Sequence, residues 1–145
     1  MAHIEPALKA TERYGAISEL LDRLTAAGAI TRSAEPELSA AFRRREEVMS
    51  TGIGFGIAVP HVFSPGVAET VVAFGRSLAG VPFAALDSFP VEFIFLFIFP
   101  ADAATRDSDL KSLSRTTRRL DHRQMRNALR RCTTAQEIQS ILEGL

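Results

Sequence analysis

The segment Val91–Phe99 (VEFIFLFIF) constrains the fold of this chain more than any other. It is almost continuously apolar, whereas a strand with one exposed face would alternate between apolar and polar residues. Such a run, bounded by Pro90 and Pro100, is typical of a strand that helices bury on both faces. With Pro100 it has about half of the ~18–20 residues that a membrane-spanning helix needs. We therefore predict a central strand and no membrane insertion.

The rest of the chain supplies helices for both sides of this strand. Apolar residues recur at helical spacing from Ile17 to Leu24 and from Leu38 to Met49, and Thr134–Glu137 matches a capping box. The predicted elements are helices at about 15–27 and 34–49, strands at 57–60, 70–78 and 91–99, a loop at 81–90, and helices over 110–120, over 125–129 and after 134. This order predicts an α/β fold, a three-layer α/β/α sandwich with a small mixed central sheet.

Length and composition limit the class of protein. The chain has 145 residues, so we expect a single domain over 1–145. Apolar residues make up 46% and charged residues 23%, which excludes disordered, collagen-like and coiled-coil chains. The formal net charge is zero, so no overall field attracts nucleic acid or anionic lipid. Cys132, the single cysteine, cannot form an internal disulfide, and the first ten residues do not read as a secretory signal. We therefore expect a cytoplasmic protein.

One histidine is a candidate functional residue. His61 ends a predicted short strand, directly after Pro60, whose fixed φ stiffens the backbone. Glycines at positions 52, 54 and 56 precede it. Glycine backbone lets N–H groups approach an anion closely, so Gly52, Gly54 and Gly56 could form a small anion-binding nest beside the imidazole. The alternative is a surface-loop histidine with no role.

The residues around His61 resemble a known family. Arg45-Glu46 followed by STGIGFGIAVPH (residues 50–61) closely resembles the signature of the enzyme IIA type-2 domain of the bacterial phosphoenolpyruvate-dependent phosphotransferase system, in its mannitol/fructose and nitrogen-regulatory branch. The resemblance continues through Gly75-Arg76, through residues 81–87, through the strand that ends at Pro100, and through residues 110–115. It covers about residues 12–143.

This resemblance implies a function and partners. His61 would accept a phosphoryl group from a histidine-phosphorylated carrier protein, and would pass it to a IIB partner or use it as a regulatory, nitrogen-type signal. Neutral imidazole suits this role because it is a nucleophile at cellular pH. Arg45, at the family's Arg-Glu position, is the expected cation near the phosphoryl oxygens. The resemblance implies no cofactor and no metal.

The chain departs from the family pattern at two positions. Phe55 stands where the family usually has asparagine, and Asp109 stands where the family usually has a second histidine that helps to hold the phosphoryl group. A carboxylate about 5 Å from a phosphoryl group would repel it by roughly 1–2 kcal/mol in bulk water. It would also raise the pKa of His61. An alternative is therefore a degenerate relative that is not phosphorylated and serves as a regulatory protein-binding module.

Two further patterns carry weaker predictions. The segment 115–131 contains seven arginines and one opposing charge, Asp121. This raises a third hypothesis, a nucleic-acid-binding surface. The segment has no interleaved aromatic residues, which favours a solvated or protein-facing surface and no nucleic-acid partner. His3, His61, His122 and Cys132 lack the spacing of metal ligands, so no metal site is expected.

Overall fold

The strand β6 (Val91–Pro100) forms the centre of the fold in the computed structural model, which describes residues 2–102 and 105–143. Its side chains divide by kind between the two faces of the sheet. The phenylalanines at 93, 95, 97 and 99 pack into one core, and Ile94, Leu96 and Ile98 pack into the other. The continuous apolar pattern is therefore two alternating patterns, one aromatic and one aliphatic, and the prediction of a strand buried on both faces is confirmed.

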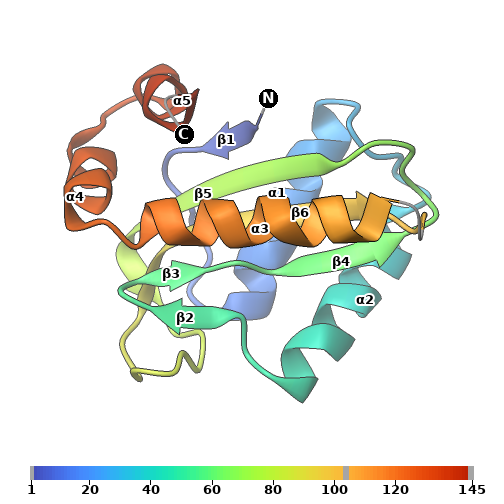
Figure 1. Cartoon of the computed structure of the whole chain (residues 1–145), viewed down its shortest axis with the longest axis horizontal. Helices are drawn as coiled ribbons and strands as arrows, with labels where there is room; N and C mark the ends of the chain where they lie inside the picture. The colour runs from blue at the N-terminus through green and yellow to red at the C-terminus, as the bar shows by residue number, and fades with distance from the viewer. Residues whose placement is uncertain (1, 103–104, 144–145) are drawn as a thin grey trace.

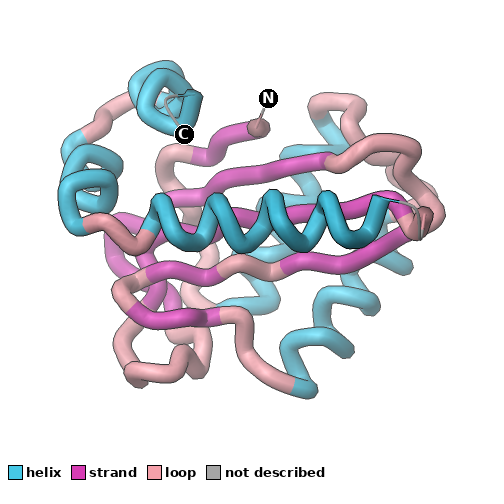
Figure 2. The backbone as a smooth tube through the Cα atoms, in the orientation of Figure 1, coloured by secondary structure: helices cyan, strands magenta, loops and turns pink. Residues whose placement is uncertain are grey.

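β6 lies within a mixed sheet (Figure 2). The other strands are β1 (His3–Glu5), β2 (Gly52–Gly54), β3 (Ile57–Ala58), β4 (His61–Ser64) and β5 (Val71–Val81). Their order is β1-β5-β6-β3-β2, and β4 also pairs with β6. β5 runs antiparallel to β6, whereas β3 and β4 run parallel to it one after the other.

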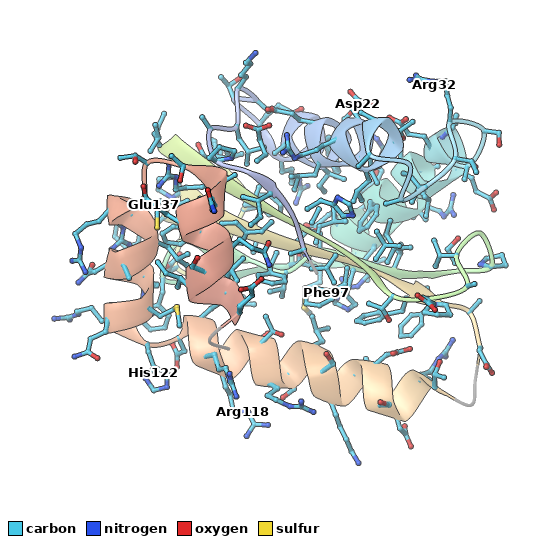
Figure 3. The ribbon with its side chains drawn as sticks, turned by 90° about the horizontal axis from the view of Figure 1, so that it is seen from above. Asp22, Arg32, Phe97, Arg118, His122 and Glu137 are labelled. Atoms are coloured by element: carbon cyan, nitrogen blue, oxygen red, sulfur yellow. The ribbon has the colours of Figure 1, made fainter. Side chains whose placement is uncertain are left out.

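Helices cover both faces of the sheet (Figure 1). α1 (Arg13–Ala26) and α2 (Glu35–Val48) pack on the aliphatic face. α3 (Arg106–Leu120), α4 (Arg123–Arg131) and α5 (Ala135–Glu143) pack on the aromatic face. Figure 3 shows the two sets of helices on opposite sides of the sheet, with Phe97 in the layer between the sheet and α3. The predicted three-layer α/β/α fold is confirmed.

The elements differ from the prediction at several places, and β2 and the strand after His61 were not predicted. β1 was not predicted, because three residues are too few to show a period, and its pairing with β5 is a tertiary contact. β5 continues to Val81, which pairs with Val91. α3 begins at Arg106 rather than near Leu110, because its first turn is polar and shows no apolar period. His61 begins β4 instead of ending a strand.

No helix in the part of the chain that the structure describes is long and apolar enough to cross a membrane.

Candidate functional site

His61 stands on the face of the sheet that α3 to α5 cover. Its Cα partner on β6 is Phe97. Side chains alternate along a strand, so His61 shares a face with Phe63, whose ring centroid lies 5.3 Å from that of Phe99 in the aromatic core. The imidazole is half-buried. The strand therefore aims it at the α3 side of the molecule.

A backbone hydrogen bond determines the tautomer of the imidazole. Nδ1 of His61 lies 2.8 Å from the carbonyl oxygen of Val59. A carbonyl oxygen can only accept, so Nδ1 carries the proton and Nε2 keeps its lone pair. Burial lowers the pKa of His61 below its ordinary value, and the nearby charge of Arg45 adds to this shift. The bond to Val59 and the charge of Glu46 act in the opposite direction, but the net shift is downward, which favours the neutral ring at pH 7.

A chain of hydrogen bonds connects this segment to α2. The N–H of Val59 donates to the carbonyl oxygen of Thr51 at 3.0 Å. Thr51 in turn donates its N–H, at 3.1 Å, and its hydroxyl to the carboxylate of Glu46. Glu46 is only 2% exposed and lies 3.7 Å from Arg13. The buried carboxylate therefore holds the backbone that orients His61.

Neither Glu46 nor Thr51 has a predicted role from the sequence. Both residues lie within the family-like segment, so their presence was visible, but no periodicity predicts a hydrogen bond between them. A buried glutamate on a helix is unusual unless its charge is paired or hydrogen-bonded. The pairing only becomes visible once α2 and the start of β2 are placed next to each other.

Arg45 lies in the last turn of α2, close enough to His61 to lower the pKa of its imidazole. Its Nη1 donates to the carbonyl oxygen of Met49 at 2.9 Å, which holds the side chain against the end of the helix. Arg45 therefore places a positive charge near the imidazole.

The glycine segment forms a tight turn whose contacts are with carboxylates. Gly54, Phe55 and Gly56 all have positive φ, at +100°, +57° and +77°. The N–H of Phe55 donates to Asp87 at 3.1 Å, and a Cβ on Gly56 would lie 3.2 Å from a carboxylate oxygen of Glu92. These neighbours suit a hairpin turn between β2 and β3 and oppose the binding of an anion at this point.

The register of β6 separates this turn from His61. The carbonyl oxygen of Gly56 accepts the N–H of Phe93 at 2.9 Å, whereas His61 pairs with Phe97. Four residues of strand span about 13 Å. Gly52 pairs with Ala58 and is one residue nearer along β6. The structure does not bring the three glycines together beside the imidazole.

Asp109 lies in the first turn of α3, on the side that meets the sheet. Arg106, three residues earlier, places its guanidinium 4.6 Å from the ring centroid of Phe63, and Leu113, four residues later, is buried in the aromatic core. The Oδ2 of Asp109 accepts a hydrogen bond from the hydroxyl of Thr105 at 3.2 Å. Asp109 therefore lies on the same side of the sheet as the imidazole of His61.

The expected effect of Asp109 on His61 is wrong. Its carboxylate was expected to raise the pKa of His61, but that pKa is lowered. The neighbouring charges that contribute are Arg45 and Glu46, both on α2. Burial is thus the main cause of the lowered pKa of His61, and the charges that modify this pKa lie on α2.

Two further charged residues have partners within the protein. Glu92 forms a double hydrogen bond with Arg130, at 2.8 and 2.9 Å. Arg126 is buried and donates to the carbonyl oxygens of Leu120 and Asp121, so the arginine-rich segment is not simply a solvated surface. Within residues 2–102 and 105–143, no group of three or more potential ligands is placed to hold a metal ion.

The chain is similar to proteins of one family over nearly its whole length. Residues 1–144 match the family model described as "Phosphoenolpyruvate-dependent sugar phosphotransferase system, EIIA 2". The PTS system fructose-specific EIIA component of Haloferax volcanii is 36% identical over 130 residues, which are 90% of this chain and 82% of that protein. A nitrogen regulatory protein of Bradyrhizobium diazoefficiens is 31% identical over 96% of this chain and 88% of its own length.

A solved structure agrees with these sequence relatives. The nitrogen regulatory protein IIA-Ntr of Neisseria meningitidis superimposes with a TM-score of 0.84 and 27% sequence identity, over 97% of this chain and 92% of that chain. The half-buried His61 of this structure is the histidine of the Pro60-His61 pair and lies within the matched residues. The chain belongs to the EIIA type 2 family of the phosphoenolpyruvate-dependent sugar phosphotransferase system.

Proposed function

We propose that this protein carries a phosphoryl group on Nε2 of His61, which it accepts from a histidine-phosphorylated carrier protein. The observation that carries the proposal is the hydrogen bond from Nδ1 of His61 to the carbonyl oxygen of Val59. Nε2 can therefore attack without a general base, because it carries no proton and its lone pair is free. The lowered pKa of His61 keeps that lone pair available at neutral pH.

The transfer step exchanges one phosphorus–nitrogen bond for another. The Nε2 lone pair attacks phosphorus while the bond to the carrier's imidazole breaks, and that bond's electron pair returns to the carrier nitrogen. His61 keeps its Nδ1 proton, and the positive charge that develops on the ring is stabilised by the carbonyl oxygen of Val59. In a second exchange, an imidazole or a thiolate of another protein attacks phosphorus while the bond to Nε2 of His61 breaks, and the group is passed on. The protein's tasks are to position the ring and to neutralise the phosphoryl charge.

Two residues act on the phosphoryl group with opposite sign. Arg45 lies near the imidazole, and its guanidinium favours the phosphoryl oxygens. Asp109 lies on the same side of the sheet as the imidazole; it does not measurably shift the pKa of the ring, but its carboxylate acts by like-charge repulsion against a doubly negative phosphoryl group that extends from the ring. The backbone of Gly52, Gly54 and Gly56 shapes the turn that leads to β3, so its contribution to phosphoryl binding is through the position of this strand.

The phosphoryl group is passed to a IIB partner, or the phosphorylated state of His61 itself acts as a regulatory, nitrogen-type signal. The similarity to a nitrogen regulatory protein over 96% of this chain supports the regulatory, nitrogen-type role. The fructose-specific relative supports sugar transport. A second candidate function follows from Asp109: a relative that has kept the fold and its protein contacts but has lost efficient phosphorylation.

Phosphorylation in vitro tests the proposal. Incubation with phosphoenolpyruvate, enzyme I and a cognate carrier should add one acid-labile phosphoryl group to the wild-type protein. His61→Ala should take up none, and His122→Ala, the matched control on the exposed N-cap of α4, should be labelled like the wild type. Labelling of His61→Ala would rule out His61 as the acceptor. Wild type that stays unlabelled would favour the second candidate function.

A further inference from the structure

A groove of about 640 Å³ lies at the end of the molecule away from His61. We call it the distal groove. It is formed by the β2–β3 turn at Phe55, the end of the β5–β6 hairpin at Leu78 and Phe89, and one face of α4 with Arg123, Arg126 and Arg130. The β2–β3 turn and α4 lie at the same end of the fold (Figure 1). We propose that the distal groove docks a partner protein through a segment in which a bulky apolar side chain is flanked by carboxylates.

The floor of the distal groove is apolar and open to solvent. Phe55 is 60% exposed, Leu78 73% and Phe89 68%. Single exposed apolar residues are ordinary, but three that line one concave surface mark an interaction site. Aromatic residues and arginine are also the types that concentrate the binding energy at protein interfaces.

Phe55 occupies a backbone position that its residue type disfavours. Its φ of +57° lies in the left-handed region, which costs a residue with a Cβ roughly 1–2 kcal/mol. The ring recovers little of this cost through burial, because most of it is exposed. Asparagine tolerates this conformation better and would be the expected residue if only the turn mattered. A large exposed ring at a strained position indicates that the ring itself has a use.

The ring of Phe55 is also held in place before any partner binds. The guanidinium of Arg126 lies 4.9 Å from its centroid, and Arg126 is itself fixed by hydrogen bonds to the carbonyl oxygens of Leu120 and Asp121. The backbone N–H of Phe55 is bound by Asp87. A surface fixed in this way loses little conformational entropy when a partner binds.

The wall of the distal groove selects the charge of the partner. Arg123, Arg126 and Arg130 are spaced three and four residues apart on one face of α4. Arg126 is bound to carbonyl oxygens, and Arg130 is paired with Glu92. Within the described residues Arg123 has no such partner, so its guanidinium is the donor available to a carboxylate from outside.

The same groove is poorly suited to nucleic acid. Asp87 and Glu92 line it, but their carboxylates are already bound by backbone N–H groups and by Arg130. Among the described residues of the groove this leaves Arg123 as the unpaired charge, whereas a phosphate backbone is bound by a row of cations. Leu78 offers an aliphatic surface, which packs against protein side chains rather than stacking on bases. An acidic, apolar protein segment therefore fits the groove better than an oligonucleotide.

The distal groove is separate from the phosphoryl-transfer site. Glu92 at the groove and Phe97 beside His61 are five residues apart on β6, which is about 16 Å. A partner docked here leaves the imidazole accessible. The inference thus goes beyond the proposed phosphoryl-carrier role and does not depend on it.

Peptide binding measured by NMR and fluorescence anisotropy tests this inference. The probe is a fluorescein-labelled peptide with a central Phe-Leu pair flanked by two glutamates on each side. Two altered peptides serve as controls. The basic peptide has lysine in place of each glutamate, and the alanine peptide has alanine in place of the Phe-Leu pair. We expect the acidic peptide to bind and to shift the amide signals of Phe55, Leu78 and Arg123, with both altered peptides at least tenfold weaker.

Protein variants locate the site. Phe55→Asn removes the ring while suiting the positive φ, and Arg123→Glu reverses the free charge; each should weaken the acidic peptide at least tenfold. Arg118→Glu, the same charge change on the exposed face of α3, should alter binding less than twofold (Figure 3). His61→Ala should bind like the wild type, and Arg123→Glu should be phosphorylated like the wild type.

Several results would overturn the inference. One is that the acidic peptide does not bind, or binds no better than the basic peptide. Another is that the acidic peptide binds Phe55→Asn and Arg123→Glu as tightly as it binds the wild type. A third is that a single-stranded oligothymidine binds more tightly than the acidic peptide. Loss of phosphorylation with intact peptide binding would instead contradict the proposed function and leave the docking inference supported.

Discussion

Nη1 of Arg76 on β5 lies 2.9 Å from the carbonyl oxygen of Leu129 on α4, so a buried cation in the sheet holds a helix 53 residues further along the chain. The same nitrogen also donates to the carbonyl oxygen of Cys132, and Nε donates to that of Pro6 at 2.9 Å. Arg76 is 4% exposed. One side chain therefore connects the first residues, the sheet and the end of α4.

Arg76→Met should destabilise the protein strongly. It removes three hydrogen bonds and leaves their carbonyl acceptors buried, so we expect the free energy of unfolding to fall by about 2–4 kcal/mol. Urea denaturation at pH 7, followed by circular dichroism, measures this. Arg118→Met, on the exposed face of α3, is the control and should stay within about 0.5 kcal/mol of the wild type. An Arg76→Met protein as stable as this control would show that the three bonds contribute little.

Glu46→Gln should change the titration of His61. The charge of Glu46 raises the pKa of the imidazole, so its removal should lower that pKa further. The variant also weakens the two hydrogen bonds that Thr51 donates to residue 46, so the free energy of unfolding should fall by about 1–3 kcal/mol. An NMR titration of the His61 ring measures the pKa. Glu47→Gln, one position away and exposed, should leave both quantities unchanged, and an equal effect of the two variants would contradict the prediction.

The lowered pKa of His61 predicts how stability depends on pH. Below the ordinary value of 6.5 the unfolded chain binds a proton at this residue, while the folded protein does not until the pH reaches its lower pKa. The contribution of His61 to stability is therefore lost as the pH falls through 6.5. Urea unfolding between pH 7.5 and pH 5.5 should show the wild type losing stability relative to His61→Gln. A constant difference between the two proteins would mean that folding does not shift this pKa.

Asp109→His should increase the extent of phosphorylation of His61, and Asp109→Asn should give part of that increase. Both variants remove a carboxylate from the side of α3 that meets the sheet, and with it the repulsion of the phosphoryl group. The pKa of His61 should stay the same, because its lowering comes from burial and from Arg45. Time courses of phosphoryl uptake measure the effect. Asp107→Asn, in the same helical turn but exposed, is the control; if it matches Asp109→Asn, position 109 has no special effect.

Asp22→Asn should remove an unfavourable pair of acids between α1 and α2. A hydrogen bond with Glu35 and burial raise the pKa of Asp22, and the same bond lowers the pKa of Glu35. A raised carboxyl pKa in the folded state means that stability increases as the pH falls through that value. Asp22 is exposed, so the gain for Asp22→Asn at pH 7 should be only a few tenths of a kcal/mol. Unfolding at pH 7 and pH 4 should show this gain disappearing at the lower pH.

The sequence predicted the layers of the fold because the pattern of burial is local. The apolar run of β6 and the helical spacing around Leu20 and Leu38 each lie within a single element. The pairing of β1 with β5 and the break between β3 and β4 at Val59 and Pro60 depend on neighbours distant in the chain, so no local pattern shows them.

The candidate site was predictable at His61 and not in its surroundings. The Pro-His pair and Arg45 were visible in the sequence as members of a family-like segment. The Glu46–Thr51 contact joins two elements, and the position of the glycine turn along β6 is set by strand register. The direction of the pKa shift at His61 depends on burial, which the sequence does not show, and this is why the expected effect of Asp109 was wrong.

The division of β6 into phenylalanines on one face and isoleucine or leucine on the other has a consequence for how this strand can change in evolution. A substitution at one position alters one core only, because the neighbouring positions serve the other core. A single-residue deletion would instead turn every later side chain to the opposite face, exchanging aromatic rings for smaller aliphatic groups in both cores at once. It would also move His61 out of register with Phe97. We therefore expect relatives to vary at individual positions of this strand while its length stays invariant.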